Sequence, residues 1–225
     1  MSLGRPRLHV RSIGSTNERA RELALAGAPH GTVVTAGEQT AGRGRQGRGW
    51  STPPGTALAL SLVIREPDPL LSLRAGLAVA DIAGSHARVK WPNDVLIDDR
   101  KVAGVLVEGR PQEGWAVVGI GINVAVDLTA LPEELRATAG TLGRRPEDLE
   151  PVLHEVLAAL EARLREPPGA TVTALRARDA LRDRPVRWAD GAGVGAGIDA
   201  SGQLLVRTED GSLVTLAAGE VHLGR

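Results

Sequence analysis

Apolar and polar positions along the chain repeat with two different periods. Residues 8–13 alternate apolar and polar side chains, a pattern that is typical of a half-buried strand. Between 147 and 165, leucine and valine recur at spacings of three and four, which predicts an amphipathic helix. Continuous apolar runs at 56–65 and 115–124 predict buried strands. The chain is therefore expected to contain both helices and strands.

The shorter apolar segments extend this order of elements. Further strands are predicted at 31–36, 89–91, 95–97 and 101–108. Further helices are predicted at 18–24, with Ser15 or Thr16 as N-cap, and at 71–86, 131–136 and 171–181. Strands 95–97 and 101–108 are close enough in sequence to form a hairpin. The expected fold class is α+β, with a mixed, mostly antiparallel sheet and flanking helices.

The pattern changes after Asp183. Short apolar runs now occupy 186–188, 195–199, 204–207 and 213–216. The pairs that separate them, which favour hairpin turns, are Asp190-Gly191, Ser201-Gly202 and Asp210-Gly211. We therefore predict a first domain over 1–183 and a small β-barrel domain over 184–225.

Composition places the chain among globular proteins without net charge. Its 225 residues are 42% hydrophobic and 24% charged. Lysine plus arginine and aspartate plus glutamate each number 27, whereas nucleic-acid-binding proteins usually carry a basic excess. The absence of cysteine excludes disulfides, thiolate metal sites and a thiol nucleophile. Because residues 1–11 contain no apolar core of signal-peptide length and no run in the chain approaches a membrane span, we expect a cytoplasmic protein without membrane association.

The most unusual stretch of the chain runs from Gly37 to Trp50. Here Arg43, Arg45 and Arg48 alternate with glycines. Arginine offers several donors to phosphate or carboxylate, and glycine lets the backbone approach a ligand closely. The stretch alone fits an anion-binding loop, a solvated basic turn or a non-specific nucleic-acid contact. Because the whole chain is neutral, we favour a small anionic ligand.

Sequence context excludes two familiar nucleotide-binding motifs. Residues 42–49 resemble a P-loop, but Arg48 and Gly49 replace the required lysine and hydroxyl, and the prolines that follow prevent a helix. Gly119 and Gly121 lack the third glycine and the following helix of a dinucleotide-binding fingerprint. Being two residues apart on a predicted strand, they share one face, where glycine often marks the close approach of a ligand.

Three polar clusters are candidates for chemistry beside this loop. The Ser-Thr-Asn run at 15–17 either caps the following helix or binds a polar ligand head. Lys90 and Lys101 flank the predicted hairpin; they either face solvent or join the arginines in stabilising charge on a phosphorus. Asp94 is a candidate for holding Mg²⁺, which prefers carboxylates, phosphate oxygens and water.

Together these segments resemble the biotin protein ligases of the monofunctional kind. The matching motifs are Ser15-Thr16-Asn17, Gln39 to Trp50, Lys90-Trp91-Pro92-Asn93-Asp94, Arg100 to Gly104 with Glu108, Gly119 to Asn123, and Gly219-Glu220-Val221. They occur in the family's order and span nearly the whole chain. Gln46 departs from the pattern, because some relatives carry a further basic residue there. The resemblance implies the class II synthetase-like fold of biotin and lipoate ligases, followed by an SH3-like β-barrel.

The resemblance also implies an ATP-dependent activity in two half-reactions. Biotin and ATP, with Mg²⁺, form biotinyl-5′-AMP and pyrophosphate, and the biotinyl group then passes to a lysine of an acceptor. The expected acceptor is the biotin carboxyl carrier domain of an acetyl-CoA, other acyl-CoA or pyruvate carboxylase. Longer family members carry an N-terminal DNA-binding domain, whereas these ligase motifs begin close to Met1, so no DNA partner is expected. The protein is expected to be a monomer or a weak homodimer.

The family's site residues carry over to the matching positions of this chain. The implied biotin site consists of Ser15, Thr16, Asn17, Gln39, Gly42, Arg43, Gly44, Arg45, Lys101, Gly104, Gly119 and Gly121. The implied ATP and adenylate site consists of Arg43, Arg45, Arg48, Trp50, Asn93, Lys101 and Asn123. The implied catalytic residues are Lys101, Arg45, Asp94 and Lys90. Asp94 is expected either to hold Mg²⁺, through phosphate, or to assist the incoming amine.

Two other functions remain open from the sequence. A lipoate ligase or octanoyltransferase is expected to share the catalytic fold; the loop at 43–45 and the motif at 90–94 favour biotin. A nucleic-acid-binding module would use Arg43, Arg45 and Arg48. Zero net charge and the lack of an exposed aromatic platform disfavour that module.

Overall fold

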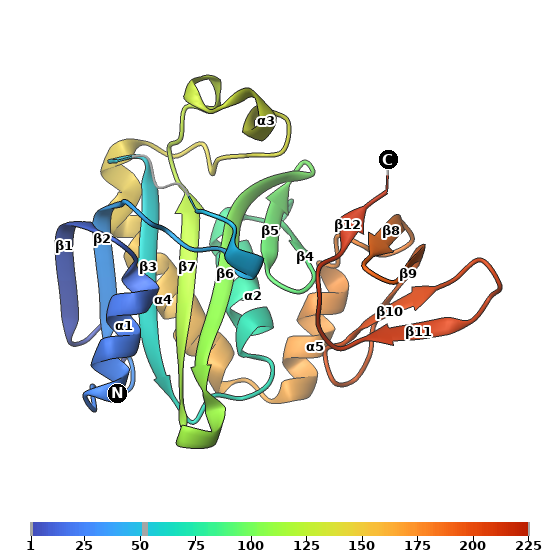
Figure 1. Cartoon of the computed structure of the whole chain (residues 1–225), viewed down its shortest axis with the longest axis horizontal. Helices are drawn as coiled ribbons and strands as arrows, with labels where there is room; N and C mark the ends of the chain where they lie inside the picture. Colours follow the sequence, from blue (N-terminus) through green and yellow to red (C-terminus); the bar gives the residue numbers. More distant parts are fainter. Residues whose placement is uncertain (1, 51–53, 225) are drawn as a thin grey trace.

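The computed structural model describes residues 2–50 and 54–224, and these form two β-sheets with flanking helices (Figure 1). The strands of the larger sheet are β1 (Arg7–Ile13), β2 (Val33–Gln39), β3 (Ala57–Arg65), β4 (Arg88–Lys90), β5 (Asp94–Ile97), β6 (Arg100–Arg110) and β7 (Trp115–Asn123). Their order across the sheet is β1-β2-β3-β7-β6-β5-β4. β1 and β2 run parallel, and the other neighbouring strands run antiparallel. This confirms the predicted α+β fold with a mixed, mostly antiparallel sheet.

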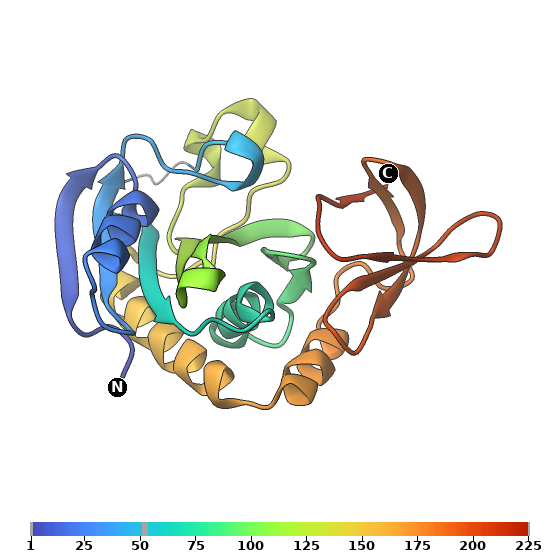
Figure 2. The same cartoon turned by 60° about the horizontal axis from the view of Figure 1, so that its bottom comes forward.

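Helices cover both faces of the larger sheet. The helices of the described residues are α1 (Thr16–Leu25), α2 (Leu71–Ala83), α3 (Glu133–Arg136), α4 (Leu149–Arg165) and α5 (Pro168–Ala177), with short 3₁₀ turns η1 (Arg45–Gly47), η2 (Pro111–Glu113), η3 (Leu128–Ala130) and η4 (Pro146–Asp148). The short α3 lies in the loops beyond the ends of the strands (Figure 1). α2 and α4 pack together on one face, and α1 lies on the other (Figures 1 and 2). Within the described residues, no helix combines the length and the apolar character needed to cross a membrane.

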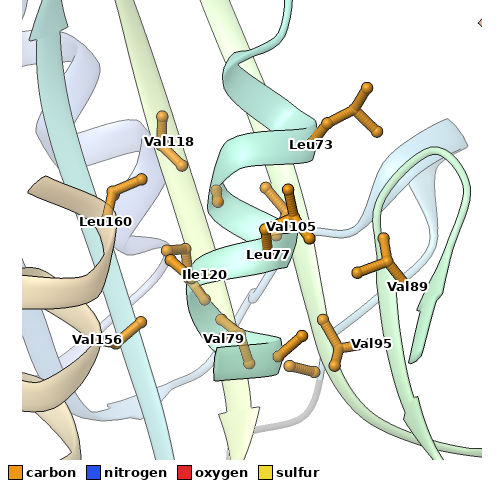
Figure 3. Close-up of a cluster of buried hydrophobic side chains, with 14 of the residues drawn as sticks. Leu73, Leu77, Val79, Val89, Val95, Val105, Val118, Ile120, Val156 and Leu160 are labelled. Carbon is orange, nitrogen blue, oxygen red and sulfur yellow. The ribbon is translucent and has the colours of Figure 1, made fainter. Parts of the chain in front are cut away.

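Strand β3 shows why the sequence folds into this layered arrangement. Leu60 and Leu62 belong to the core beneath α2 and α4, whereas Val63 belongs to the smaller core beneath α1. Successive strand residues point to opposite faces, so a strand that is covered on both sides is apolar throughout. Figure 3 shows Leu77 of α2 packed beside Ile120 of β7 in the larger core. Each such fully buried side chain stabilises the fold by about 1.5–3 kcal/mol.

The helix boundaries differ from the predictions by up to four residues, and the last helix differs at both ends. The pattern predicts a helix over 171–181, but α5 begins at Pro168 and ends at Ala177. Proline is favoured in the first helical turn because its missing N–H would have no partner there. Beyond α5, the Asp179 carboxylate accepts a hydrogen bond from the Leu181 backbone N–H at 2.8 Å. That side-chain bond stabilises a turn in place of further helix.

The second sheet lies at the opposite end of the molecule from β1 (Figure 1). Its strands are β8 (Pro185–Trp188), β9 (Gly191–Ile198), β10 (Leu204–Arg207), β11 (Leu213–Leu216) and β12 (His222–Leu223), in the order β11-β10-β9-β8-β12. Across residues 2–50 and 54–224, β11 pairs only with β10 and β12 only with β8, so the sheet has two open edges. The SH3-like closed barrel predicted for 184–225 is therefore not confirmed.

β9 begins at Gly191, four residues before the strand predicted at 195–199. The prediction missed its first half, because glycines there interrupt the apolar pattern. A Cβ at Gly193 would lie 2.4 Å from the carbonyl oxygen of Arg207, and one at Gly195 would lie 2.0 Å from that of Leu181. Glycine in a strand permits this close approach of another backbone segment. Hydrophobic periodicity does not detect such a strand.

Candidate active site

A cavity opens where the N-terminus of α1, strands β3, β6 and β7, and the η1 turn meet. The predicted site residues that line it are Ser15, Thr16, Asn17, Gln39, Arg43, Gly44, Arg45, Arg48, Trp50, Lys90, Asn93, Asp94, Lys101, Gly104, Gly119 and Gly121. The lining residues outside that prediction are Gly49, Ala59, Leu60, Trp91, Pro92, Val105, Leu106, Ile120, Glu220 and Val221. Motifs that are far apart in the sequence therefore meet in one cavity.

Two predicted site residues, Gly42 and Asn123, do not line the cavity. The carbonyl of Gly42 accepts a hydrogen bond from the Trp50 backbone N–H at 2.9 Å, and a Cβ at Gly42 would lie 2.2 Å from the Trp50 carbonyl oxygen. Gly42 thus closes the base of the arginine-rich loop. The Asn123 side-chain amide donates to the Gly140 carbonyl at 2.8 Å and so anchors the segment that follows α3. Both residues position parts of the chain around the cavity.

Glycines of β6 and β7 provide a flat surface under the cavity. A Cβ at Gly121 would lie 2.2 Å from the indole ring of Trp50, and one at Gly119 would lie 2.1 Å from Oδ1 of Asn17. On β6, a Cβ at Gly104 would lie 3.4 Å from the same indole. Any larger residue at Gly119 or Gly121 would displace these side chains, as expected of glycines that mark a close approach.

Hydrogen-bonded polar side chains, some buried and some half-buried, form what we call the polar floor, which consists of Thr16, Asn17, Gln39, Ser61 and Glu108. The Thr16 backbone N–H donates to Gln39 Oε1 at 2.8 Å. The Ser61 hydroxyl lies 2.8 Å from Thr16 Oγ1 and 2.6 Å from Asn17 Oδ1. Asn17 Nδ2 donates to Glu108 Oε2 at 2.8 Å. Ser61 is fully buried, and Thr16 and Asn17 are nearly so, which makes every bond in this floor costly to break.

Helix capping explains how α1 presents this floor. Ser15 is the N-cap, and its hydroxyl accepts a hydrogen bond from the Glu18 backbone N–H at 3.5 Å. Thr16 and Asn17 are therefore the first two helical residues, with their side chains turned toward β3 and β6. The two sequence interpretations of residues 15–17, a helix cap and a polar pocket, are both compatible with this arrangement.

Positively charged groups form the opposite part of the lining, which we call the cationic cluster: Arg45, Arg48, Lys90 and Lys101. Lys101 Nζ lies 2.7 Å and Lys90 Nζ 3.8 Å from the Asp94 carboxylate. Burial lowers the pKa of Lys90 from its ordinary value, and the charge of Lys101 acts in the same direction, whereas Asp94 opposes the shift. Lys101 Nζ also lies 5.6 Å from the centroid of the Trp50 ring.

The arginine-rich loop is tied to the C-terminal segment of the chain. Arg45 donates to Asn93 Oδ1 and to the Gly219 carbonyl, each at 2.8 Å. Arg48 forms an ion pair with Glu220 at 2.5 Å. Sequence reasoning missed Glu220 as a site residue, although the segment 219–221 is among the matching motifs. The signal that could have identified it is a lone carboxylate in a motif that otherwise offers no chemistry.

Trp50 carries a buried polar atom without a partner. Its indole Nε1 forms no hydrogen bond with the residues that the structure describes. Buried N–H groups are nearly always paired, so an unpaired one beside a cavity points to a ligand or water acceptor. The predicted place of Trp50 next to a nucleotide is compatible with this position.

The described part of the chain contains no group of three or more histidine, cysteine, aspartate and glutamate side chains that could hold a metal ion. The cavity carboxylates Asp94 and Glu220 are each paired with a cation. These residues do not fit a metal site built by the protein alone. The assignment of Asp94 to Mg²⁺ stays a prediction that no direct contact supports.

Comparison with protein families identifies two matching segments of the chain. Residues 10–127 match the Biotin/lipoate A/B protein ligase family, and residues 193–224 match the Biotin protein ligase C terminal domain. The Biotin--[acetyl-CoA-carboxylase] ligase of Paracoccus denitrificans is 36% identical over 236 residues, covering 93% of this chain and 97% of that protein. The protein of the same name from Mycobacterium tuberculosis is 35% identical over 239 residues, covering 95% and 88%.

Solved structures agree with the sequence comparison. The biotin protein ligase from Aquifex aeolicus in complex with biotin and ATP superposes with a TM-score of 0.85 at 30% sequence identity. The superposition covers 98% of this chain and 99% of that one. Family match, relatives and fold agree over nearly the whole length, and the chain belongs to the biotin/lipoate A/B protein ligase family.

Proposed function

We propose that this chain is a biotin protein ligase that activates biotin with ATP and transfers the biotinyl group to a lysine of a carrier protein. The observation that carries the proposal is one cavity with two chemically different parts, the polar floor and the cationic cluster. A substrate with a neutral hydrogen-bonding head and a carboxylate tail suits such a cavity. Biotin has both, in its ureido ring and its valerate chain.

The polar floor favours biotin over lipoate or octanoate. The dithiolane ring of lipoate and the alkyl end of octanoate offer no N–H or C=O to Thr16 or Gln39. Binding either of them would bring an apolar group against the nearly buried Thr16 hydroxyl, at a cost of about 1–3 kcal/mol. The ureido ring of biotin offers hydrogen-bonding groups to this hydroxyl. The relatives from Paracoccus denitrificans and Mycobacterium tuberculosis are both named as biotin ligases, which supports the same choice.

The cationic cluster suits the first half-reaction. A carboxylate oxygen of biotin attacks the α-phosphorus of ATP, the bond to the β-phosphate oxygen breaks, and pyrophosphate leaves. Negative charge grows on the phosphoryl oxygens, and Lys101 is our candidate for stabilising it because its ammonium is held in place by Asp94 at 2.7 Å. Arg45 and Arg48 are candidates for the remaining phosphate contacts, in exchange for the protein acceptors that they now bind.

The same cluster suits the second half-reaction. The amine of the acceptor lysine attacks the acyl carbon of biotinyl-5′-AMP, the bond to the phosphate oxygen breaks, and AMP leaves. The amine must lose a proton, and Asp94 is the carboxylate nearest to the cluster lysines. Lys90 lies beside it with a lowered pKa. We assign Asp94 to orienting these ammonium groups and to accepting the proton that the incoming amine loses.

The remaining predicted roles belong to the same proposal. We assign Trp50, with Asn93, to the nucleotide, and Arg43 and Gly44 to the part of the loop that covers biotin. Mg²⁺ would supply charge neutralisation on the ATP phosphates. Because Asp94 and Glu220 are already paired with cations, we route no step of the reaction through the ion.

The organisation of the chain and its partners are also proposed. We divide the chain into a catalytic domain over 1–183 and a C-terminal domain over 184–225. The start of the second sheet at Pro185 supports this division. The acceptor that we propose is the biotin carboxyl carrier domain of an acyl-CoA or pyruvate carboxylase. The acceptor lysine has to reach the cavity between the cationic cluster and the C-terminal segment 219–221.

A direct test is incubation of the chain with biotin, Mg-ATP and a purified biotin carboxyl carrier domain. Intact-mass spectrometry should show one added biotinyl group on the carrier and none when its acceptor lysine is changed to arginine. Lipoate in place of biotin should give no product. Addition of lipoyl with no addition of biotinyl would assign the chain to the other branch of the family.

A further inference from the structure

The polar floor includes one residue, Glu108, that lies outside the cavity lining. Its carboxylate reaches the cavity only through other side chains. Glu108 Oε2 accepts a hydrogen bond from Asn17 Nδ2 at 2.8 Å, and the Leu106 carbonyl lies 3.4 Å from the same nitrogen. A carboxylate and a carbonyl can only accept, so the nitrogen end of the Asn17 amide must face them. The orientation of Asn17 is therefore fixed by Glu108.

This orientation determines where the Ser61 proton lies. The oxygen end of the Asn17 amide faces Ser61 Oγ at 2.6 Å, and an amide oxygen has no proton to give. The Ser61 hydroxyl must therefore donate to Asn17. Because Ser61 has a single hydroxyl proton and is fully buried, nothing remains for it to donate to Thr16, whose Oγ1 lies 2.8 Å away.

Counting donors and acceptors in the same way shows which groups can accept the Thr16 hydroxyl proton. Thr16 Oγ1 has two acceptors within reach, Ser61 Oγ at 2.8 Å and Gln39 Oε1 at 3.0 Å, and both belong to the floor. Whichever accepts it, the Thr16 proton is taken up by another residue of the floor. The part of the Thr16 hydroxyl that remains for a ligand is a lone pair. The floor thus offers a hydrogen-bond acceptor at this position and would repel another acceptor.

We propose that Glu108 is a positioning residue that sets the direction of the hydrogen bonds through Asn17 and Ser61, so that Thr16 accepts from an N–H of the bound ligand. The inference rests on the proposed function, in which this N–H belongs to the ureido ring of biotin. Glu108 contacts neither biotin nor ATP. It acts by excluding the opposite direction of these hydrogen bonds, in which Thr16 would donate its proton to the ligand.

The test is Glu108→Gln in the full-length chain. Glutamine has nearly the same shape, but its amide can donate as well as accept. The Asn17 amide is then free to turn, and the direction of the hydrogen bonds through Asn17 and Ser61 is no longer fixed. In pyrophosphate-release kinetics we expect KM for biotin to rise about tenfold, equivalent to about one hydrogen bond, while KM for ATP and kcat change less than twofold. The matched control is Glu113→Gln on the same β6–β7 hairpin, an exposed residue that pairs with Arg110 at 2.7 Å; it should leave all three constants unchanged.

Ser61→Ala provides the second variant, because it removes the hydroxyl that links Asn17 to Thr16. If Glu108 and Ser61 act through the same series of hydrogen bonds, the double variant should raise KM for biotin no more than the stronger single variant does. Three results would overturn the proposal: an unchanged KM in Glu108→Gln, equal rises in KM for biotin and ATP, or multiplicative effects in the double variant. If the unmodified chain releases no pyrophosphate with biotin, the proposed function fails, which is distinguishable from these results.

Discussion

The polar floor and the arginine-rich loop, which we propose to contact different parts of the bound substrates, are held in place by different interactions. The floor is built on α1, β2, β3 and β6, and its central side chains are buried and hydrogen-bonded to one another. The loop is held by two ion pairs, Arg48 to Glu220 at 2.5 Å and Arg43 to Glu18 at 3.9 Å, and by the Arg45 hydrogen bonds to Asn93 and Gly219. In both loop pairs the arginine side chain is substantially exposed, so these pairs contribute little stability.

This difference suggests that the floor and the loop have separate roles. A rigid floor discriminates among ligand heads, because an apolar ligand head offers no hydrogen bond to the nearly buried Thr16 hydroxyl. A loop that is held by weak ion pairs can exchange its protein partners for phosphate. Substitutions in the floor should therefore change biotin affinity. Substitutions in the loop and the cationic cluster should change the formation and the retention of the adenylate.

The largest effect should come from Lys101→Ala. This change removes the ammonium that we place beside the reacting phosphate. We expect adenylate formation to fall by about 100- to 1,000-fold, since removal of one preorganised charge contact typically costs that much in kcat. Biotin binding, measured by calorimetry, should stay within a few-fold. Pyrophosphate release at the normal rate would remove Lys101 from the chemistry.

The next largest effect should come from Gly119→Ala in the floor. The new Cβ would lie 2.1 Å from Asn17 Oδ1, so Asn17 must move and break its bonds to Ser61 and Glu108. Overpacking of this kind costs about 1–3 kcal/mol, which corresponds to a loss of biotin affinity of about 10- to 100-fold. The control is Gly169→Ala, where a Cβ meets nothing within 4 Å. Normal biotin affinity in Gly119→Ala would show that the floor adapts.

A smaller effect, and one of a different kind, should follow from Arg45→Gly in the loop. The change removes two hydrogen bonds, to Asn93 and Gly219, and adds a glycine to a segment that is already flexible. We expect biotinyl-5′-AMP to escape about tenfold faster or more, with its synthesis retained through Lys101. Escaped adenylate acylates any amine, so bystander proteins should become biotinylated. If only the carrier domain is labelled, as by the unmodified chain, the loop does not retain the intermediate.

The smallest effect should come from Glu220→Gln. This variant removes the charge partner of Arg48, and Glu18→Gln is the matched control because Glu18 lies farther from its arginine. Surface ion pairs contribute about 0–1 kcal/mol, so we expect trypsin to cleave after Arg45 or Arg48 a few-fold faster in Glu220→Gln than in the control. Biotin with ATP should protect the loop in the unmodified chain. Equal cleavage in both variants would show that the C-terminal segment does not hold the loop.

Much of the larger sheet could be predicted from the sequence, because burial leaves a periodic signal. The continuous apolar run of β3 and the three-four spacing of α4 follow directly from cores on both faces of the sheet. The start of β9 could not be found in this way, since Gly193 and Gly195 serve a close backbone approach and not a core. Whether strands 184–225 close into a barrel depends on pairing between the outer strands, which no local pattern records.

In the candidate site, the residues themselves were easier to predict from the sequence than the side chains with which they pair. The cluster of Lys90, Asp94 and Lys101 follows from a short hairpin that brings its two ends together. The pairing of Arg48 with Glu220 joins distant segments and depends on how the second sheet packs. Ser61 lies inside an apolar strand, where a small hydroxyl residue gives no signal of its own. Its role appears only when the proton donors of its neighbours are counted.

The most direct test of the central claim is isolation of the intermediate. The chain is mixed with biotin and Mg-ATP in the absence of any acceptor, separated from free ligand by rapid gel filtration, and analysed by mass spectrometry. We predict one equivalent of biotinyl-5′-AMP per chain, which disappears with release of AMP when a biotin carboxyl carrier domain is added. A chain that emerges without bound adenylate from biotin, or with lipoyl-AMP when lipoate is supplied, would contradict the account.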